Sequence, residues 1–387
     1  MIGPGVTAHG PPKLSQTGWL WHEAYGWHDT GRAAGYVTAQ PGAQPFTHFE
    51  SAETKTRFAS LIEVSGLREQ LVDIRPRPAT IDDLHRVHSM KHINAMRAQS
   101  SNPRGGDMGD GTSPFAWGGY DIAALSAGGT LEATRAVMDG AVRNAYALVR
   151  PPGHHALPDR GMGFCMFANV AIAIEYARVH FGVDRVAVLD WDVHHGNGTE
   201  TIYAQDPRTL TISIHQDRNF PTDSGDVTDN GRGRGVGSAI NVPLPPGSGN
   251  GAYLDTFTRV VEPSLMRFRP ELIMVAAGFD AGAADPLSAM LVTSSTYRTM
   301  TSRTVELAEQ LCDGRLIMSH EGGYSPVYVP FCGLAAVEAL SGLDSGIADP
   351  FEPDWLNWAG QDIQPHQEQV IARAQAAAAD GLAQLGI

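Results

Sequence analysis

A short apolar segment that ends in acidic and imidazole side chains constrains this chain most. Residues 185–189 read Arg-Val-Ala-Val-Leu, too short and too rich in β-branched residues for a helix, so we predict a buried strand. Asp190, Asp192, His194 and His195 follow directly. Carboxylates at the end of a buried strand need a cation, a proton or several donors, because isolated charge is costly in an apolar interior. The pattern favours a divalent metal site, and a polar turn with hydrogen-bonded histidines is the alternative.

Composition excludes several classes of function. The formal net charge of −14 argues against nucleic-acid binding, which needs clustered Lys and Arg, and is compatible with a cationic substrate. The three cysteines, Cys165, Cys312 and Cys332, form no CxxC pair, which is typical of a reducing compartment. We recognise no signal peptide and no apolar run of the roughly 20 residues that a membrane helix needs. We therefore expect a cytoplasmic protein without a membrane partner.

Buried strands alternate with helices along the chain, which predicts an α/β fold with a mostly parallel central sheet and helices on both faces. We expect residues 1–18 to form an N-terminal arm and residues 19–387 to form one domain. The predicted strands are 19–22, at a sheet edge, and 71–75, 145–149, 185–189, 209–215, 271–277 and 315–319. The predicted helices are 53–70, one that begins at 80, 121–139, 169–180, 254–267, 294–311 and 364–385. The last helix should pack on the body or on a second subunit, so a homo-oligomer stays open.

Long loops with polar signatures follow four of the predicted strands. They contain His154 and His155, the segment Asp190 to His195, Asp280, and Tyr324. In parallel sheets, ligands bind beyond the carboxyl ends of the strands, so these loops should converge. Asp192, His194 and Asp280 would then hold one ion and leave a position for water, as catalytic zinc sites require. Asp285 is the competing third ligand.

Such an arrangement favours hydrolysis of an amide or ester, because a bound divalent ion acidifies water and polarises a carbonyl group. His154 and His155 can supply general acid–base catalysis, and Asp190 can fix the tautomer of one imidazole. Tyr324 follows two glycines and can donate a hydrogen bond to a developing oxyanion, although an aromatic ring packed over a glycine turn is the alternative.

Two further groups of polar residues have simpler interpretations. His85, His88 and His92 lie at helical spacing, and a solvated or core-edge helix face is favoured over a metal site. Asp107 and Asp110 lie in the long loop 100–119, either at the rim of a site or as ordinary turn residues.

At these residues the sequence resembles the histone deacetylase family and its arginase/deacetylase fold, with the strongest likeness to class II enzymes and bacterial histone-deacetylase-like amidohydrolases. The matching segments are Arg-Pro-Pro-Gly-His-His at 150–155, Gly-Met-Gly-Phe-Cys at 161–165, Asp-Trp-Asp-Val-His-His-Gly-Asn-Gly-Thr at 190–199, Gly-Phe-Asp at 278–280 and Glu-Gly-Gly-Tyr at 321–324. Five motifs in the expected order are far more specific than any one of them.

The resemblance implies a role for each matching residue. Asp192, His194 and Asp280 would bind zinc, or ferrous iron in the cell. His155 would be the general acid–base and His154 mainly electrostatic, with Asp190 behind His154 and Asn197 near His155. Tyr324 favours a competent deacylase, because some members with His at this place deacetylate acetyl-lysine poorly.

The resemblance also implies a substrate channel and structural cation sites. Gly163, Phe164, Phe220 and Leu287 would line a narrow channel for an alkyl chain, and Asp110 would hydrogen-bond the substrate at its rim. A structural potassium ion would bind Asp190, Asp192, His194, Ser213 and Ile214, and a second monovalent cation would lie near Tyr203 and Asp206.

The expected function is removal of acetyl or other acyl groups from lysine-like amines. An acetylpolyamine amidohydrolase is the near alternative, and a non-catalytic acyl-lysine binding module is the remote one. An arginase-like ureohydrolase would need more aspartates around the Asp-x-Asp-x-His loop, and the Pro-Pro-Gly-His-His segment argues against it.

Overall fold

A computed structural model describes residues 16–387, and a sheet of eight parallel strands forms its centre. From edge to edge the strands are β10 (Ala239–Leu244), β9 (Thr209–Gln216), β8 (Val186–Asp190), β11 (Leu272–Ala277), β12 (Leu316–His320), β7 (Asn144–Ala147), β1 (Thr17–Leu20) and β4 (Val72–Asp73). Every pair of neighbouring strands in this sheet is parallel. The predicted α/β fold with a parallel central sheet is confirmed.

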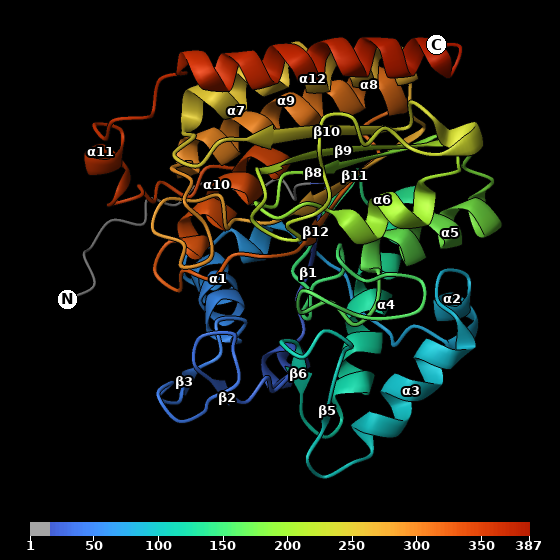
Figure 1. Cartoon of the computed structure of the whole chain (residues 1–387), viewed down its shortest axis with the longest axis vertical. Coiled ribbons are helices and arrows are strands. Elements are labelled where there is room, and N and C mark those ends of the chain that lie inside the picture. The colour runs from blue at the N-terminus through green and yellow to red at the C-terminus, as the bar shows by residue number, and fades with distance from the viewer. Residues whose placement is uncertain (1–15) are drawn as a thin grey trace.

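Helices cover both faces of the sheet (Figure 1). One face carries α1 (Glu53–Val64), α7 (Asn250–Thr256), α8 (Glu262–Phe268), α9 (Ser294–Cys312), α10 (Val329–Ser341) and α12 (Pro365–Gln384). The other carries α2 (Ile81–His85), α3 (Met90–Ser100), α4 (Gly119–Met138), α5 (Asn169–Phe181) and α6 (Asn197–Tyr203). Two small ribbons, β2 (Arg32–Ala33) with β3 (Phe46–Thr47) and β5 (Gly106–Asp107) with β6 (Pro114–Phe115), and the short α11 (Glu352–Trp355) complete the fold. Within residues 16–387, no helix is long and apolar enough to cross a membrane.

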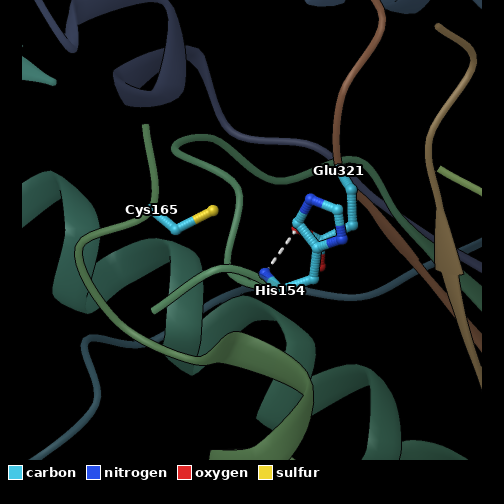
Figure 2. Close-up of side chains that lie close together, drawn as sticks. All are labelled: His154, Cys165 and Glu321. Carbon is cyan, nitrogen blue, oxygen red and sulfur yellow. Dashed lines mark hydrogen bonds between the residues drawn. The ribbon is translucent and has the colours of Figure 1, made fainter. Parts of the chain in front are cut away.

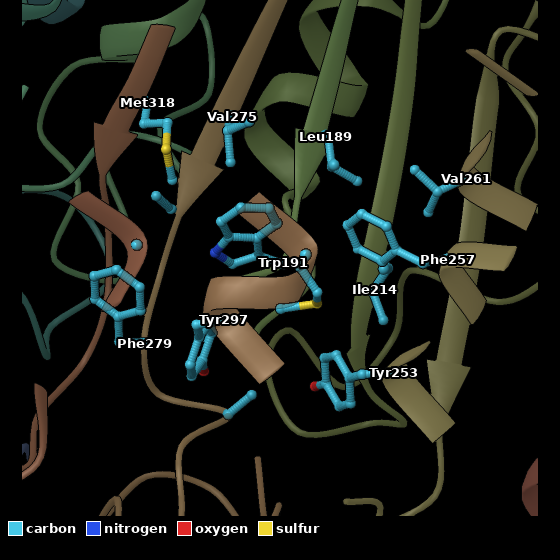
Figure 3. Close-up of a cluster of buried hydrophobic side chains, with 14 of the residues drawn as sticks. Leu189, Trp191, Ile214, Tyr253, Phe257, Val261, Val275, Phe279, Tyr297 and Met318 are labelled. Atoms are coloured by element: carbon cyan, nitrogen blue, oxygen red, sulfur yellow. The ribbon is translucent and has the colours of Figure 1, made fainter. Parts of the chain in front are cut away.

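The largest core explains how β8 aims its polar residues. Leu189 and Trp191 are fully buried and pack with Ile214, Phe257 and Val275 between the sheet and the helices of one face (Figure 3). Because successive side chains of a strand point to opposite faces, burial of these two apolar residues turns Asp190 to the other side. The strand geometry of β8 thus directs Asp190 to the face on which Val186 and Val188 are buried, opposite Leu189 and Trp191.

Two glycines of α4, Gly128 and Gly129, allow close packing. A Cβ atom at Gly128 would lie 1.7 Å from the carbonyl oxygen of Arg77, and one at Gly129 would lie 2.5 Å from the hydroxyl oxygen of Tyr25. No side chain fits at such distances. The helix can therefore lie directly against the chain that covers it only because both positions are glycine.

Several predicted elements need correction. β1 was expected at an edge, but it lies between β7 and β4. No element was assigned to residues 238–253 or 325–341, where β10, the start of α7, and α10 form. The predicted helix 53–70 ends at Val64 and is followed by a 3₁₀ turn at Arg68–Gln70. The arm predicted at residues 1–18 lies mostly outside the described residues, and residues 17 and 18 already belong to β1.

Two expectations about helix faces agree with the structure. His92 on α3 is buried, and its ring hydrogen-bonds the carbonyl oxygen of Met166, as a core-edge position predicts. The single helix expected from residue 80 is two helices, and His88, buried and bonded to the carbonyl oxygen of Leu157, lies in the break between them. Helix α12 packs on the body of the molecule, with Ile371 among its residues buried in the large core.

Candidate metal centre and acid–base site

The loops after β8 and β11 bring Asp192, His194 and Asp280 to one point. One potential ligand atom from each residue lies within 4.8 Å of the other two, and all three residues are buried. His194 Nδ1 is 3.0 Å from Asp192 Oδ1 and 3.1 Å from Asp280 Oδ2. β8 and β11 are direct neighbours in the sheet, so their carboxyl ends place these side chains together.

The electrostatics of this cluster fit a divalent cation. Burial and the charge of Asp192 raise the pKa of Asp280 to about 6. Burial lowers the pKa of His194, but its hydrogen bonds with both carboxylates outweigh burial and raise that pKa to about 10. Two buried carboxylates repel each other in a low dielectric, and a cation between them removes this repulsion.

Backbone groups hold the carboxylates in place, and glycine leaves room for them. The Gly322 N–H donates to Asp192 Oδ2 at 2.7 Å, and the Val193 N–H donates to Asp280 Oδ1 at 2.7 Å. A Cβ atom at Gly322 would lie 2.1 Å from Asp280 Oδ2. Outer hydrogen bonds of this kind orient metal ligands, so the chain forms a preorganised cradle.

Asp285, the alternative third ligand, has a different position. Its Oδ2 accepts a hydrogen bond from the N–H of Tyr324 at 2.7 Å, and its Oδ1 accepts one from the N–H of Leu287 at 2.9 Å. Burial and the nearby Asp280 raise the pKa of Asp285 to about 8. Asp285 therefore shapes the loop that carries Tyr324, while Asp280 joins the cluster.

The tandem histidines have different partners. His154 Nδ1 is 2.9 Å from Asp190 Oδ2, whereas His155 Nδ1 is 2.7 Å from Asn197 Oδ1. Burial lowers the pKa of His154, but Asp192 and Asp190 outweigh burial and raise it well above its usual value. Burial and the imidazoles of His154 and His194 push the pKa of His155 well below its usual value. The surroundings thus favour the protonated form of His154 and the neutral form of His155.

Glu321, which the sequence analysis did not assign a role, holds the loop of the tandem histidines. Its Oε2 accepts a hydrogen bond from the N–H of Gly153 at 2.6 Å and another from the N–H of His154 at 3.0 Å. Figure 2 shows the bond from His154. Cys165 lies close to both side chains, but burial raises the pKa of its thiol well above the usual range. A neutral thiol is a poor metal ligand. We therefore interpret His154, Cys165 and Glu321 as a group that holds the histidine loop in place and not as a second metal site. The position of Glu321 directly after the buried strand β12 is the sequence feature that could have indicated this role, since the carboxylates after β8 were recognised in the same way.

A cavity of about 410 Å³ opens beside the cluster. The four predicted channel residues, Gly163, Phe164, Phe220 and Leu287, all line it, together with Tyr36 and Thr112. His155, His194 and Tyr324 reach the same cavity, whereas His154 is not among its lining residues. The imidazole of His155, the candidate ligand His194 and the phenol of Tyr324 therefore line the same cavity.

Unusual backbone geometry sets the aromatic walls of this cavity. Gly163 and Phe164 both have positive φ, 55° and 66°. A Cβ atom at Gly163 would lie 2.3 Å from His155 Cδ2, so only glycine fits beside the histidine. The Phe164 ring packs edge-on against Tyr324 at 5.8 Å, and Phe220 packs edge-on against His155 at 4.9 Å. The walls thus stand directly against the polar groups.

Asp110 supports the channel wall. Its Oδ2 accepts hydrogen bonds from the Gly163 N–H at 2.7 Å and the Ser113 hydroxyl at 2.9 Å. Its Oδ1 accepts one from the N–H of Thr112. Asp110 is not itself among the residues that line the cavity, and its predicted contact with a substrate at the rim stays a prediction.

The predicted monovalent cation sites differ in their surroundings. Asp190 and Ser213 are paired across β8 and β9, next to Asp192, so the first set of residues is contiguous. At the second site, Asp206 forms an ion pair with Arg178 at 2.8 Å. Because the guanidinium of Arg178 lies so close to Asp206, it would repel a monovalent cation at this predicted second site.

A buried charge cluster connects the N-terminal loops to the histidine loop. Arg150 Nε and Nη2 donate to Glu50 Oε1 and Oε2, both at 2.8 Å, and Lys55 Nζ lies 3.5 Å from Glu50 Oε1. All three side chains are at most 1% exposed. Burial raises the pKa of Glu50, but the two cations outweigh burial and lower it to about 2.

Replacing Glu50 with glutamine is expected to destabilise the protein by about 3–5 kcal/mol, because it leaves two buried cations without their shared anion. Urea denaturation of both proteins gives the change in the free energy of unfolding. Glu53→Gln, whose side chain is 51% exposed and pairs with Arg57 on the surface, is the control and should change it by less than about 1 kcal/mol. Equal effects of the two substitutions would contradict the importance of the buried cluster.

The parallel sheet and the site at its carboxyl edge define an α/β protein with a buried cluster of Asp192, His194 and Asp280 beside a cavity that His155 and Tyr324 also line. The sequence profile of the histone deacetylase domain matches residues 48–340, and the chain belongs to this family. It is 48% identical over 357 residues to a histone deacetylase-like amidohydrolase of Pseudomonas aeruginosa, a match that covers 91% of this chain and 93% of the relative.

More distant relatives agree. A probable deacetylase of Archaeoglobus fulgidus is 35% identical over 352 residues, which cover 89% of this chain and 92% of the relative. The solved structure of the HDA15 HD domain superposes with a TM-score of 0.83 at 28% identity, covering 96% of this chain and 98% of that one. Membership of this family supports a hydrolase function of the deacetylase and amidohydrolase kind.

Proposed function

We propose that the protein is a zinc-dependent amidohydrolase that removes acetyl or other acyl groups from lysine-like amines. One observation carries the proposal: the cluster of Asp192, His194 and Asp280 lies beside a cavity that His155 and Tyr324 also reach. Two carboxylates and one imidazole suit zinc, and they also suit ferrous iron. A bound ion would acidify a water molecule and polarise the carbonyl group of the amide.

The side chains around the cluster have complementary tasks in this proposal. His155 has Nδ1 engaged with Asn197, so Nε2 is the atom that accepts a proton from water and returns it to the amine leaving group. His154, whose protonated form Asp190 and Asp192 favour, stabilises negative charge that develops nearby. The Tyr324 hydroxyl donates a hydrogen bond to the carbonyl oxygen as that oxygen becomes negative.

The shape of the cavity supports an acyl amine on an alkyl chain as the substrate. Phe164 and Phe220 present aromatic walls, which suit a methylene chain. An acetylated polyamine has the same chain and a cationic end, and the net charge of −14 favours such a molecule. Acetylpolyamine hydrolysis is therefore the second candidate.

An acyl-substrate panel with chelator-stripped and zinc-restored protein tests the proposal. We expect the stripped protein to lose turnover of acetyl-lysine peptides and acetylputrescine, and equimolar zinc to restore it. Adding ferrous iron to the stripped protein under anaerobic conditions compares iron with zinc. The ratio of the kcat/KM values for acetyl-lysine peptides and for acetylputrescine distinguishes the two substrate classes. Binding of an acetyl-lysine peptide to zinc-loaded protein without any turnover would contradict the proposal and indicate a binding module.

A further inference from the structure

Lysine is rare in this chain, and one lysine is completely buried beside the site. The sequence has three lysines, Lys13, Lys55 and Lys91, among 28 basic residues, so nearly every positive charge is an arginine. Lys55 lies on α1, and its side chain is 0% exposed. An ammonium group is more strongly hydrated than a guanidinium group, so burying it is unfavourable unless it has specific partners. Its position therefore needs an explanation.

The charge cluster of Glu50, Lys55 and Arg150 does not provide this explanation. Arg150 already satisfies the carboxylate of Glu50 with two hydrogen bonds at 2.8 Å. Lys55 lies farther away, at 3.5 Å from an oxygen that Arg150 also uses. With two cations and one anion, the cluster carries an excess positive charge, and removal of Lys55 would leave a neutral and fully hydrogen-bonded pair.

The other partners of Lys55 lie in the loop that carries Tyr324. Its Nζ donates a hydrogen bond to the carbonyl oxygen of Gly323 at 3.4 Å and lies over the Tyr324 ring, 5.3 Å from the ring centroid. Gly323 has φ of 125°, a conformation that glycine adopts readily and other residues rarely do. The ammonium group thus contacts both the backbone and the ring at the end of the motif 321–324.

We propose that Lys55 is a positioning residue for Tyr324, which fixes the loop through the Gly323 carbonyl and strengthens the phenol as a hydrogen-bond donor through its positive charge. A cation over an aromatic ring is held by the electron-rich face of that ring. The same charge favours negative charge that develops at or beside the phenol oxygen. This inference rests on the proposed function, in which Tyr324 donates to the developing oxyanion.

Lys55→Met tests this role, because it keeps an unbranched side chain that is only one heavy atom shorter and removes the charge. We expect kcat to fall on the order of 10-fold with KM within about 2-fold, since the interaction acts on the transition state. In the Tyr324→Phe background the same substitution should change kcat by less than about 2-fold, because the phenol through which Lys55 acts is gone. Lys91→Met, at an exposed position on α3, is the matched control and should leave all constants unchanged.

A readout without catalysis separates this inference from the proposed function. With 3-fluorotyrosine incorporated at position 324, Lys55→Met should shift and broaden the ¹⁹F resonance, and Lys91→Met should not. If the wild-type protein hydrolyses no acyl amine, the proposed function fails and this measurement alone decides the role of Lys55. An unchanged resonance, equal effects on kcat in the wild-type and Tyr324→Phe backgrounds, or a Lys55→Met protein that does not fold would each overturn the inference.

Discussion

Replacing Tyr324 with phenylalanine is expected to lower kcat by about 10²–10³-fold and to leave KM nearly unchanged. The hydroxyl is the one polar group of this side chain, and the substitution keeps the ring that packs against Phe164. Loss of one donor to a developing oxyanion has an effect of this size, because the interaction exists mainly in the transition state. Steady-state kinetics with an acetyl-lysine peptide on zinc-restored protein measures the change.

Tyr36→Phe is the control for this prediction. Tyr36 also lines the cavity, but its side chain is 46% exposed and it lies on the loop between β2 and β3. Loss of its hydroxyl should not change kcat by more than about 2-fold, because exposed groups contribute little to a preorganised site. If Tyr324→Phe and Tyr36→Phe had equal effects, the oxyanion role of Tyr324 would be wrong.

Replacing Asp280 with asparagine is expected to abolish both zinc binding at the cluster and turnover. The wild-type protein should gain about 2.7 kcal/mol in free energy of unfolding when zinc is present at 100 times its dissociation constant, because the ion binds only the folded cluster. Asparagine removes one of two anionic ligands, and this zinc-dependent gain should largely vanish. Urea denaturation with and without zinc measures the gain, and zinc titration measures affinity.

Asp285→Asn is the matched control, since Asp285 is the other buried carboxylate of the same loop and the alternative ligand. Its oxygens accept backbone hydrogen bonds from Tyr324 and Leu287 and do not join the cluster. The variant should therefore keep the zinc-dependent stabilisation and lose only part of its kcat, through displacement of Tyr324. Loss of zinc binding in Asp285→Asn but not in Asp280→Asn would reverse the ligand assignment.

The positions of the site residues followed from simple rules, whereas several of their interactions did not. Polar residues after buried parallel strands lie at one edge of the sheet, and the structure brings Asp192, His194 and Asp280 together there. The sequence did not indicate that Lys55 and Glu50 are buried. Lysine and glutamate are almost never fully buried unless they are paired, and a lysine in the first half of an amphipathic helix is usually exposed. The engagement of Asp110 with Gly163 depends on the path of two loops, which no local pattern encodes.

The elements that were missed have local reasons. β10 contains Pro243 and follows a glycine-rich segment, and proline argues against an internal strand. The structure resolves the conflict, because β10 is an edge strand, where a missing N–H group is tolerated. β1 lies inside the sheet because β4 pairs with its outer side. A strand as short as Val72–Asp73 carries too little pattern to predict that pairing.

The full burial of Lys55 has a practical consequence for handling the protein. Amine-reactive reagents couple to accessible amines, and of the two lysines in residues 16–387 only Lys91 is exposed. Lys91 lies on α3, which packs against α4. The candidate ligand cluster lies elsewhere, at the ends of the neighbouring strands β8 and β11. Dyes or surfaces attached through amines would therefore leave the ammonium group beside the loop 321–324 chemically unmodified.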